Sequence, residues 1–228
     1  MIANKKEFYG GIGMMVGFII VLIIFFSPIY DGKNGLNYLD NLYNTISKGS
    51  AYYIPKLKEE ADKFKGNSVS VTLNMADSKQ AGQTAALFRA GGATTTATEV
   101  QLKLTGDVGT ILENCLADAD AMYKNDGQAV SGKYGYDEKR VLCNWWKAFK
   151  EMEKDLKKQK KFREAEIVAL VVKKGVESSY NYYKIEPQKI GDRLGIVIFS
   201  LVFYVVYTMW YGFAIMFMFE GWGMRLEH

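Results

Sequence analysis

Two long uncharged stretches dominate the hydrophobic pattern, one close to each end of the chain. The first covers residues 8–30 and the second covers residues 194–219. At about 1.5 Å per residue, helices of these lengths are long enough to cross a hydrocarbon core of roughly 30 Å. Charged residues lie directly outside both stretches, as is usual at the ends of membrane-spanning helices. The pattern therefore predicts one transmembrane helix over each stretch.

The first stretch has the features of an uncleaved membrane anchor. Its apolar part exceeds the roughly 7 to 15 residues of a secretory signal, and Ser27-Pro28-Ile29 lacks the small-x-small pattern of a cleavage site. Two crossings put both ends of the chain on one side of a membrane, and Lys5 and Lys6 favour the cytoplasm for that side. We therefore expect a multi-pass protein of the cell inner (plasma) membrane, with an extracytoplasmic domain at residues 31–193.

The two ends of the chain are expected to be short and cytoplasmic, at residues 1–7 and 220–228. Leu226-Glu227-His228 looks like the start of an affinity tag, and His228 is the only histidine. Histidine supplies most general bases at neutral pH and most zinc ligands, so its absence from the rest of the chain excludes Ser-His and Cys-His catalysis. We therefore predict that the protein is not an enzyme and has no cofactor and no metal.

Residues 31–193 have the composition of an ordinary globular domain. The chain has 29 Lys and Arg against 25 Asp and Glu, a balance that does not predict a nucleic-acid groove. Neither GxxxxGK[ST] nor GxGxxG occurs, so nucleotide chemistry gets no support. A hydrolase that uses carboxylates is the weakest alternative, because no acidic pair stands out.

The middle of the chain alternates between helical and strand patterns. Apolar residues at intervals of three and four over 36–65 predict two helices or one kinked helix, interrupted at Gly49-Ser50 and Pro55. Alternation of apolar and polar residues predicts strands at 68–74 and 99–105. Further helices are expected at 77–89, at 109–123 and from residue 143 onward. The fold class is an α+β membrane protein, in which two transmembrane helices flank a mainly helical extracytoplasmic domain with a small β-sheet.

Three glycines of the first apolar stretch, Gly10, Gly13 and Gly17, share one helix face. Glycines at such spacings let another helix approach closely. We predict that this face packs against the second span, a copy of the chain or another subunit.

Five hydroxyl-bearing residues form a stripe in the second apolar stretch: Ser200, Tyr204, Tyr207, Thr208 and Tyr211. Hydroxyls that face lipid would lack hydrogen-bond partners. The stripe is therefore predicted to face protein, which favours subunit assembly. The alternative is that the stripe faces water and lines a pore built from several copies.

The acidic segment LADADAMYKNDG brings Asp118, Asp120, Asn125 and Asp126 close together. It fails the EF-hand template for calcium, because Ala129 stands where the template requires a glutamate. We interpret the segment as a solvated helix end.

Cys115 and Cys143 are too far apart in sequence for a CxxC motif. In an oxidising compartment they can form a disulfide, and otherwise they are expected to be two small buried hydrophobes.

A basic run, Lys157, Lys158, Lys160 and Lys161, separates two helical stripes, so that either a hairpin turns there or one long helix shifts its buried face. The run is a candidate contact for anionic lipid or an acidic glycan, although nearby acidic residues favour a solvated helix face. An aromatic group is expected to form either a binding surface or part of the core; it contains Trp145, Trp146, Tyr180, Tyr182 and Tyr183.

The order of one span, an extracytoplasmic domain and a second span resembles that of bacterial receptors, polysaccharide chain-length regulators and two-span trimeric channels, in topology alone. We expect a non-enzymatic integral membrane subunit whose extracytoplasmic domain scaffolds or recognises partners. Its helices would contact membrane lipid and assemble into a homo-oligomer or with other membrane subunits. The alternative function is a homo-oligomeric pore or channel.

Overall fold

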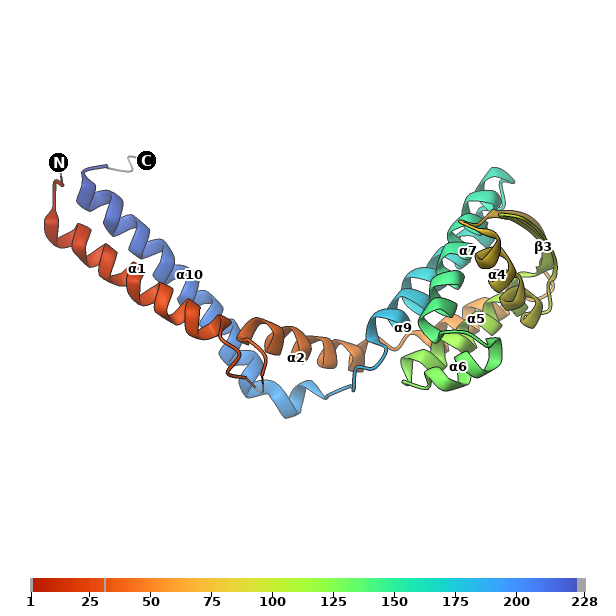
Figure 1. Cartoon of the computed structure of the whole chain (residues 1–228), viewed down its shortest axis with the longest axis horizontal. Coiled ribbons are helices and arrows are strands. Elements are labelled where there is room, and N and C mark those ends of the chain that lie inside the picture. Colours follow the sequence, from red (N-terminus) through yellow and green to blue (C-terminus); the bar gives the residue numbers. More distant parts are fainter. Residues whose placement is uncertain (1, 31, 225–228) are drawn as a thin grey trace. The chain divides into compact units, whose positions relative to one another are not determined.

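A computed structural model describes residues 2–30 and 32–224, and the expected tag remnant lies outside them. The chain is mostly helical with one small sheet (Figure 1). It divides into two compact units, of which one combines Met1–Gly49 with Pro187–His228 and the other is Ser50–Glu186. Residues 32–49 and 187–193 thus group with the two apolar helices, while the expected extracytoplasmic domain at 31–193 stays a prediction.

The first unit contains the two long apolar helices. Its elements are α1 (Lys5–Phe26), α2 (Gly35–Ser50), the 3-10 helix η2 (Ile190–Arg193) and α10 (Leu194–Trp222). Helices α1 and α10 pack side by side (Figure 1). Each is long and apolar enough to cross a membrane.

Helix α1 lies slightly earlier in the chain than the apolar pattern predicts. Asn4 caps its start by accepting hydrogen bonds from the backbone N–H groups of Lys6 and Glu7. The helix ends before Ser27, which has extended backbone, because the residue before Pro28 is driven out of the helical region. Charged Lys5 and Lys6 thus belong to the helix, although they lie outside the apolar stretch.

The central unit contains most of the other helices and the sheet. Its helices are α3 (Ile54–Asp62), α4 (Ser78–Ala90), α5 (Val108–Tyr123), α6 (Gly127–Tyr134), α7 (Glu138–Lys158), α8 (Phe162–Val171), the π-helix η1 (Val172–Val176) and α9 (Glu177–Tyr182). Its strands are β1 (Ser68–Asn74), β2 (Thr94–Thr98) and β3 (Gln101–Asp107). The predicted helices are present, and so is the strand at 68–74. The strand predicted at 99–105 begins only at Gln101, because Glu99 and Val100 form the turn that connects β2 to β3. Helix α6 and strand β2 were not expected.

The sheet is antiparallel with the strand order β1-β3-β2. Val71 lies opposite Leu104, and Leu73 lies opposite Leu102, so that one face of these two strands is apolar and buried. Strand β2 consists mainly of threonine and is largely exposed, so it lacks the alternation by which the other strands are recognised.

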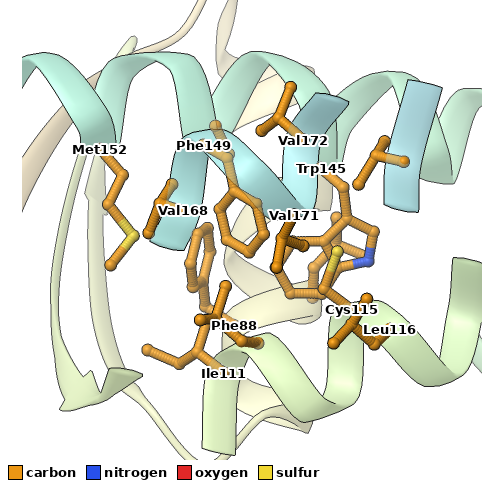
Figure 2. Close-up of a cluster of buried hydrophobic side chains, with 14 of the residues drawn as sticks. Phe88, Ile111, Cys115, Leu116, Trp145, Phe149, Met152, Val168, Val171 and Val172 are labelled. Atoms are coloured by element: carbon orange, nitrogen blue, oxygen red, sulfur yellow. The ribbon is translucent and has the colours of Figure 1, made fainter. Parts of the chain in front are cut away.

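The core of the central unit lies around Trp145 of α7 (Figure 2). The ring of Trp145 is 5.2 Å from that of Phe88 and 5.1 Å from that of Phe149. Val171 of α8 and Ile111 of α5 come close to the same aromatic group from other sides (Figure 2). One aromatic centre therefore holds helices from four separate parts of the unit.

Helices α7 and α8 form a hairpin, so the first of the two alternatives for the basic run is correct. The turn lies between Lys158 and Phe162, and Lys160 adopts a left-handed backbone with φ of 61°. The two helices pack against each other beyond the turn. Helix α7 begins at Glu138, capped by Asp137, which is five residues before the predicted start.

The N-cap of α5 makes a pH-dependent contribution to stability. Asp107 accepts hydrogen bonds from the backbone and hydroxyl of Thr110 and from the Gly66 N–H. Burial alone would raise the pKa of Asp107, but these bonds outweigh it and lower the pKa. Because the pKa is lower in the folded state, the ionised carboxyl stabilises the fold at pH values above 3.8, the ordinary pKa. This stabilisation is lost as pH falls through the pKa of the folded state.

We expect Asp107→Ala to lower the free energy of unfolding by about 1 kcal/mol at pH 7. The difference from the wild type should narrow as pH falls through the lowered pKa of Asp107, because the wild-type carboxyl then becomes protonated. Thermal unfolding in detergent, followed by circular dichroism, measures both values. Asp107→Asn keeps the acceptor oxygen and should lose less, and a penalty that does not change with pH would contradict the assignment.

Candidate functional sites

Two glycines bring the backbones of α1 and α10 together at the ends of the helices farthest from α2. A Cβ atom at Gly11 would lie 2.7 Å from the backbone nitrogen of Met218 and 2.9 Å from the carbonyl oxygen of Ala214. A Cβ atom at Gly221 would overlap the backbone of Phe8. Close contact of this kind is the usual way in which membrane helices gain packing energy.

The middle of the helix pair is packed by aromatic rings. The indole N–H of Trp210 donates to the carbonyl oxygen of Met14 at 3.0 Å. The ring of Tyr207 stacks on that of Phe18 at 4.6 Å. Buried Phe18 and Ala214 thus lie on the inner face of the pair, together with Trp210.

The outer faces of the pair are continuously apolar. Ile20, Ile23 and Ile24 of α1 are at least half exposed, as are Val202, Val205 and other branched residues of α10. Such a surface is unfavourable in water and favourable in hydrocarbon.

The three predicted glycines divide between two environments. Gly17 lies against the ring of Trp210, so it belongs to the contact between α1 and α10. Cβ atoms at Gly10 and Gly13 would meet nothing within 4 Å, so these two glycines face away from α10. Gly11, which the spacing argument did not select, makes the closer contact. The prediction that Gly10 and Gly13 contact another chain stays a prediction.

We expect Gly11→Val to destabilise the helix pair by about 1 to 3 kcal/mol, because the added carbon atoms enter backbone that has no room for them. Gly13→Val is the matched control, since its side chain enters open space. Thermal unfolding of the two variants in the same detergent gives the comparison. Equal losses at both positions would contradict this packing.

The five predicted hydroxyl residues do not share one environment. Ser200 is buried, lies 2.6 Å from the hydroxyl of Tyr43 on α2, and donates to the carbonyl of Val197. Thr208 donates to carbonyl groups of its own helix. Tyr207 and Tyr211 lie against Phe18, whereas Tyr204 is 66% exposed. Ser200 and Thr208 therefore have partners within the chain, and Tyr204 faces outward.

The acidic segment after Leu116 is not a solvated helix end. Asp118 is buried, and its Oδ2 accepts hydrogen bonds from the indole of Trp145 at 2.9 Å and from the hydroxyl of Tyr134 at 2.6 Å. Lys133 pairs with its other oxygen at 2.7 Å. The carboxylate is thus fully paired, which is the condition for burying a charge. Burial and the charge of Asp118 together raise the pKa of Tyr134.

Asp120 forms a second network nearer the surface. Its carboxylate accepts from the hydroxyl of Tyr52 at 2.7 Å and pairs with Lys124 at 3.0 Å and Lys58 at 3.5 Å. Burial would raise its pKa, but the hydrogen bonds and the neighbouring cations outweigh it and lower the pKa. Asp126 caps α6 through the Ala129 N–H. These acidic residues therefore have structural partners.

The two cysteines are free thiols and do not form a disulfide in the structure. Cys115 is fully buried in the core, and burial raises the pKa of its thiol. Cys143 lies on α7 and lines a hollow on the surface of the central unit. The buried-hydrophobe alternative therefore fits Cys115 alone.

The basic run is partly neutralised. Lys157 pairs with Glu153 at 2.6 Å, and Lys154 pairs with Glu151 at the same distance. Lys158 and Lys160 are exposed and Lys161 is half-buried at the hairpin turn. These contacts agree with a solvated face, and contact with an anion stays a prediction.

The aromatic group is divided between the core and the surface. Trp145 is in the core, and Tyr183 is buried with its hydroxyl donating to Glu138. In contrast, Trp146 and Tyr180 line the hollow beside Cys143, which has a volume of about 400 Å³. The core interpretation therefore fits Trp145 and Tyr183, while a binding surface at Trp146 and Tyr180 stays a prediction.

The hollow has aromatic walls that are held in place. The indole of Trp146 donates to Glu177 at 2.7 Å, and the ammonium groups of Lys150 and Lys139 lie 5.8 and 5.6 Å from the rings of Trp146 and Tyr180. The π-helix η1 contributes Val176 to the wall, and π-helical turns are frequent at functional sites. Rigid, half-exposed aromatic residues of this kind are common in binding surfaces.

Neighbouring tryptophans allow a direct comparison of core and surface. We expect Trp145→Ala to destabilise the central unit by about 3 to 5 kcal/mol, because it removes a fully buried ring and a partner of Asp118. Trp146→Ala should cost about 1 kcal/mol or less. Thermal unfolding followed by circular dichroism measures both. A large loss for Trp146→Ala would assign this ring to the core and remove it from the candidate binding surface.

Among the described residues, no cluster of three or more His, Cys, Asp or Glu side chains has the arrangement of a metal site. No protein-family model matches the sequence, and neither a curated protein nor a solved structure was found to be similar to the chain.

Proposed function

We propose that this chain is a non-enzymatic integral membrane subunit, in which α1 and α10 anchor an extracytoplasmic domain that scaffolds or recognises a partner. The observation that carries the proposal is the contrast between the two sides of the helix pair. Its inner face is packed by glycine and aromatic contacts, while its outer faces expose branched apolar side chains. Hydrocarbon is the solvent in which such outer faces are favourable.

The central unit supports a role in recognition. It has its own hydrophobic core, so it does not need the apolar helices to bury its apolar residues. Its hollow offers Trp146 and Tyr180 as half-exposed rings, and Trp and Tyr contribute strongly to binding where they are held rigidly. Lys5 and Lys6 at the start of α1 favour a cytoplasmic position for that end and thus an extracytoplasmic position for this unit.

Assembly with further membrane helices is supported by the outward side of α1. Gly10 and Gly13 have open space where a Cβ would be, so another helix can approach the backbone there. A pore lined by the hydroxyl stripe of α10 is less well supported. Ser200 and Thr208 already have hydrogen-bond partners within the chain, and Tyr207 packs on α1.

The proposal predicts both membrane insertion and sidedness. The test uses a Cys143→Ser chain carrying Lys158→Cys, because Lys158 is exposed at the α7–α8 turn. We expect the chain to stay in the membrane in alkaline carbonate and to react with an impermeant maleimide in intact spheroplasts. A Lys5→Cys control should react only after lysis.

Release by carbonate would contradict insertion, and labelling of the two cysteines in the reverse order would place the central unit in the cytoplasm. The mass of the solubilised particle, measured by native mass spectrometry, distinguishes the two functions. A closed ring of several copies would favour the pore, whereas a monomer or dimer would favour a subunit that lacks its partner.

A further inference from the structure

The first unit contains a cavity of about 320 Å³ between α1, α2 and α10. Its walls are almost entirely apolar and include Phe25 of α1, Leu39 of α2, and Ile196, Phe199 and Phe203 of α10. The volume lies at the lower end of the range for small-molecule sites, roughly 300 to 1,000 Å³. It is suited to a narrow apolar chain.

The cavity has a defined construction. Gly35, at the start of α2, lies directly against the ring of Phe25, and any Cβ there would overlap that ring. Farther along α2, the hydroxyl of Tyr43 is hydrogen-bonded to Ser200 of α10 at 2.6 Å. The rings of Phe25 and Phe203 stack at 5.9 Å across the remaining wall. Helix α2 is thus fixed at two points, and the cavity lies between them and the helix pair.

The position of the cavity matches the boundary of the membrane. Phe25 is in the last turn of α1 and Ile196 is in the first turn of α10, so the cavity lies where the two apolar helices end. The rings of Tyr30 and Tyr38, which also line the cavity, lie 5.9 Å apart. Tyrosines concentrate at membrane interfaces because one end of the ring is apolar and the other is polar.

Basic residues next to the cavity in sequence favour a lipid that carries a phosphate. Lys33 lies in the short loop between Tyr30 and Gly35, and Arg193 directly precedes α10. Both are exposed, and Lys189 lies just before η2. Asp31, Asp40 and Asp192 are the acidic residues nearby in sequence, and they equal Lys33, Lys189 and Arg193 in number. The net charge therefore does not select an anionic lipid, but exposed basic side chains beside a membrane helix attract the phosphate that every phospholipid carries.

We propose that this cavity holds one acyl chain of a membrane phospholipid, whose phosphate lies by Lys33 and Arg193. This inference rests on the proposed membrane insertion of α1 and α10. The cavity is lined by residues from the apolar ends of these helices and by Tyr30 and Tyr38, and the exposed side chains of Lys33 and Arg193 stand close to these lining residues in the sequence. The bound lipid would fill the space between α2 and the helix pair and so fix α2 at the membrane surface.

The test compares lipid retention by full-length chains in native mass spectrometry, after reconstitution with phosphatidylglycerol and release from nanodiscs. We expect the wild type to retain one phosphatidylglycerol. Leu39→Trp and Ile196→Trp, which fill the cavity, should reduce retention by about tenfold. The matched controls are Leu36→Trp and Ile198→Trp on the same two helices, at exposed positions outside the cavity. These controls should retain lipid as the wild type does.

Two further comparisons distinguish failure of the cavity site from failure of the headgroup assignment. The double variant Lys33→Gln, Arg193→Gln should lose the preference for phosphatidylglycerol over a fatty acid of the same chain length. Equal retention by all variants would overturn the cavity site, and equal retention of fatty acid by the wild type would overturn the headgroup assignment. Failure of every chain to enter nanodiscs would instead reject membrane insertion itself. Unchanged helix content by circular dichroism in both filling variants excludes misfolding as the cause.

Discussion

The close packing of α1 against α10 is the constraint on which the first unit depends. Gly11 and Gly221 allow the two backbones to touch at one end of the pair, and Trp210 links the helices near the middle. Because the pair is fixed, the chain leaves α1 and enters α10 at the same end. Helix α2 starts close to that end and is bonded to α10 through Tyr43 and Ser200. The apolar cavity lies between this third helix and the pair.

The central unit depends on a different interaction, the pairing of buried Asp118. Its carboxylate contacts the indole of Trp145, the hydroxyl of Tyr134 and the ammonium of Lys133, so it joins α5, α6 and α7 at one point. A charge of this kind is costly to bury unless each partner is in place. Loss of any one partner would leave this charge incompletely paired, while the rings of Phe88, Trp145 and Phe149 supply apolar area.

Much of the fold follows from local pattern. Apolar and polar residues alternate along the strand Ser68–Asn74, and Asp77 and Asp107 cap the helices that follow them. These elements can therefore be predicted from the sequence. Strand β2 could not be predicted from the sequence. Its threonines are mostly exposed, and the strand is defined only by its pairing with β3. Helix α6 is short and has few apolar residues, so it shows no clear period. Propensity could not locate elements that exist mainly through tertiary contacts.

The candidate sites were harder to predict than the elements, for a related reason. Spacing within α1 identified glycines on one face, but only the position of α10 shows that Gly11 is inside the pair and that Gly10 and Gly13 are outside it. Spacing likewise grouped the hydroxyls of α10, although Ser200 bonds to α2 and Thr208 to its own backbone.

The same limit applies to the two neighbouring tryptophans of α7. Nothing in the local sequence distinguishes them, yet Trp145 is fully buried and Trp146 is 38% exposed. Adjacent residues of a helix point about 100° apart. When an amphipathic helix buries one ring in the core, the next residue therefore lies at the edge of the buried face, nearer to solvent. Glu177 and Lys150 then hold the exposed ring in place. The aromatic hollow is therefore a product of the same packing that forms the core, because the helix that buries Trp145 also places Trp146 at the surface.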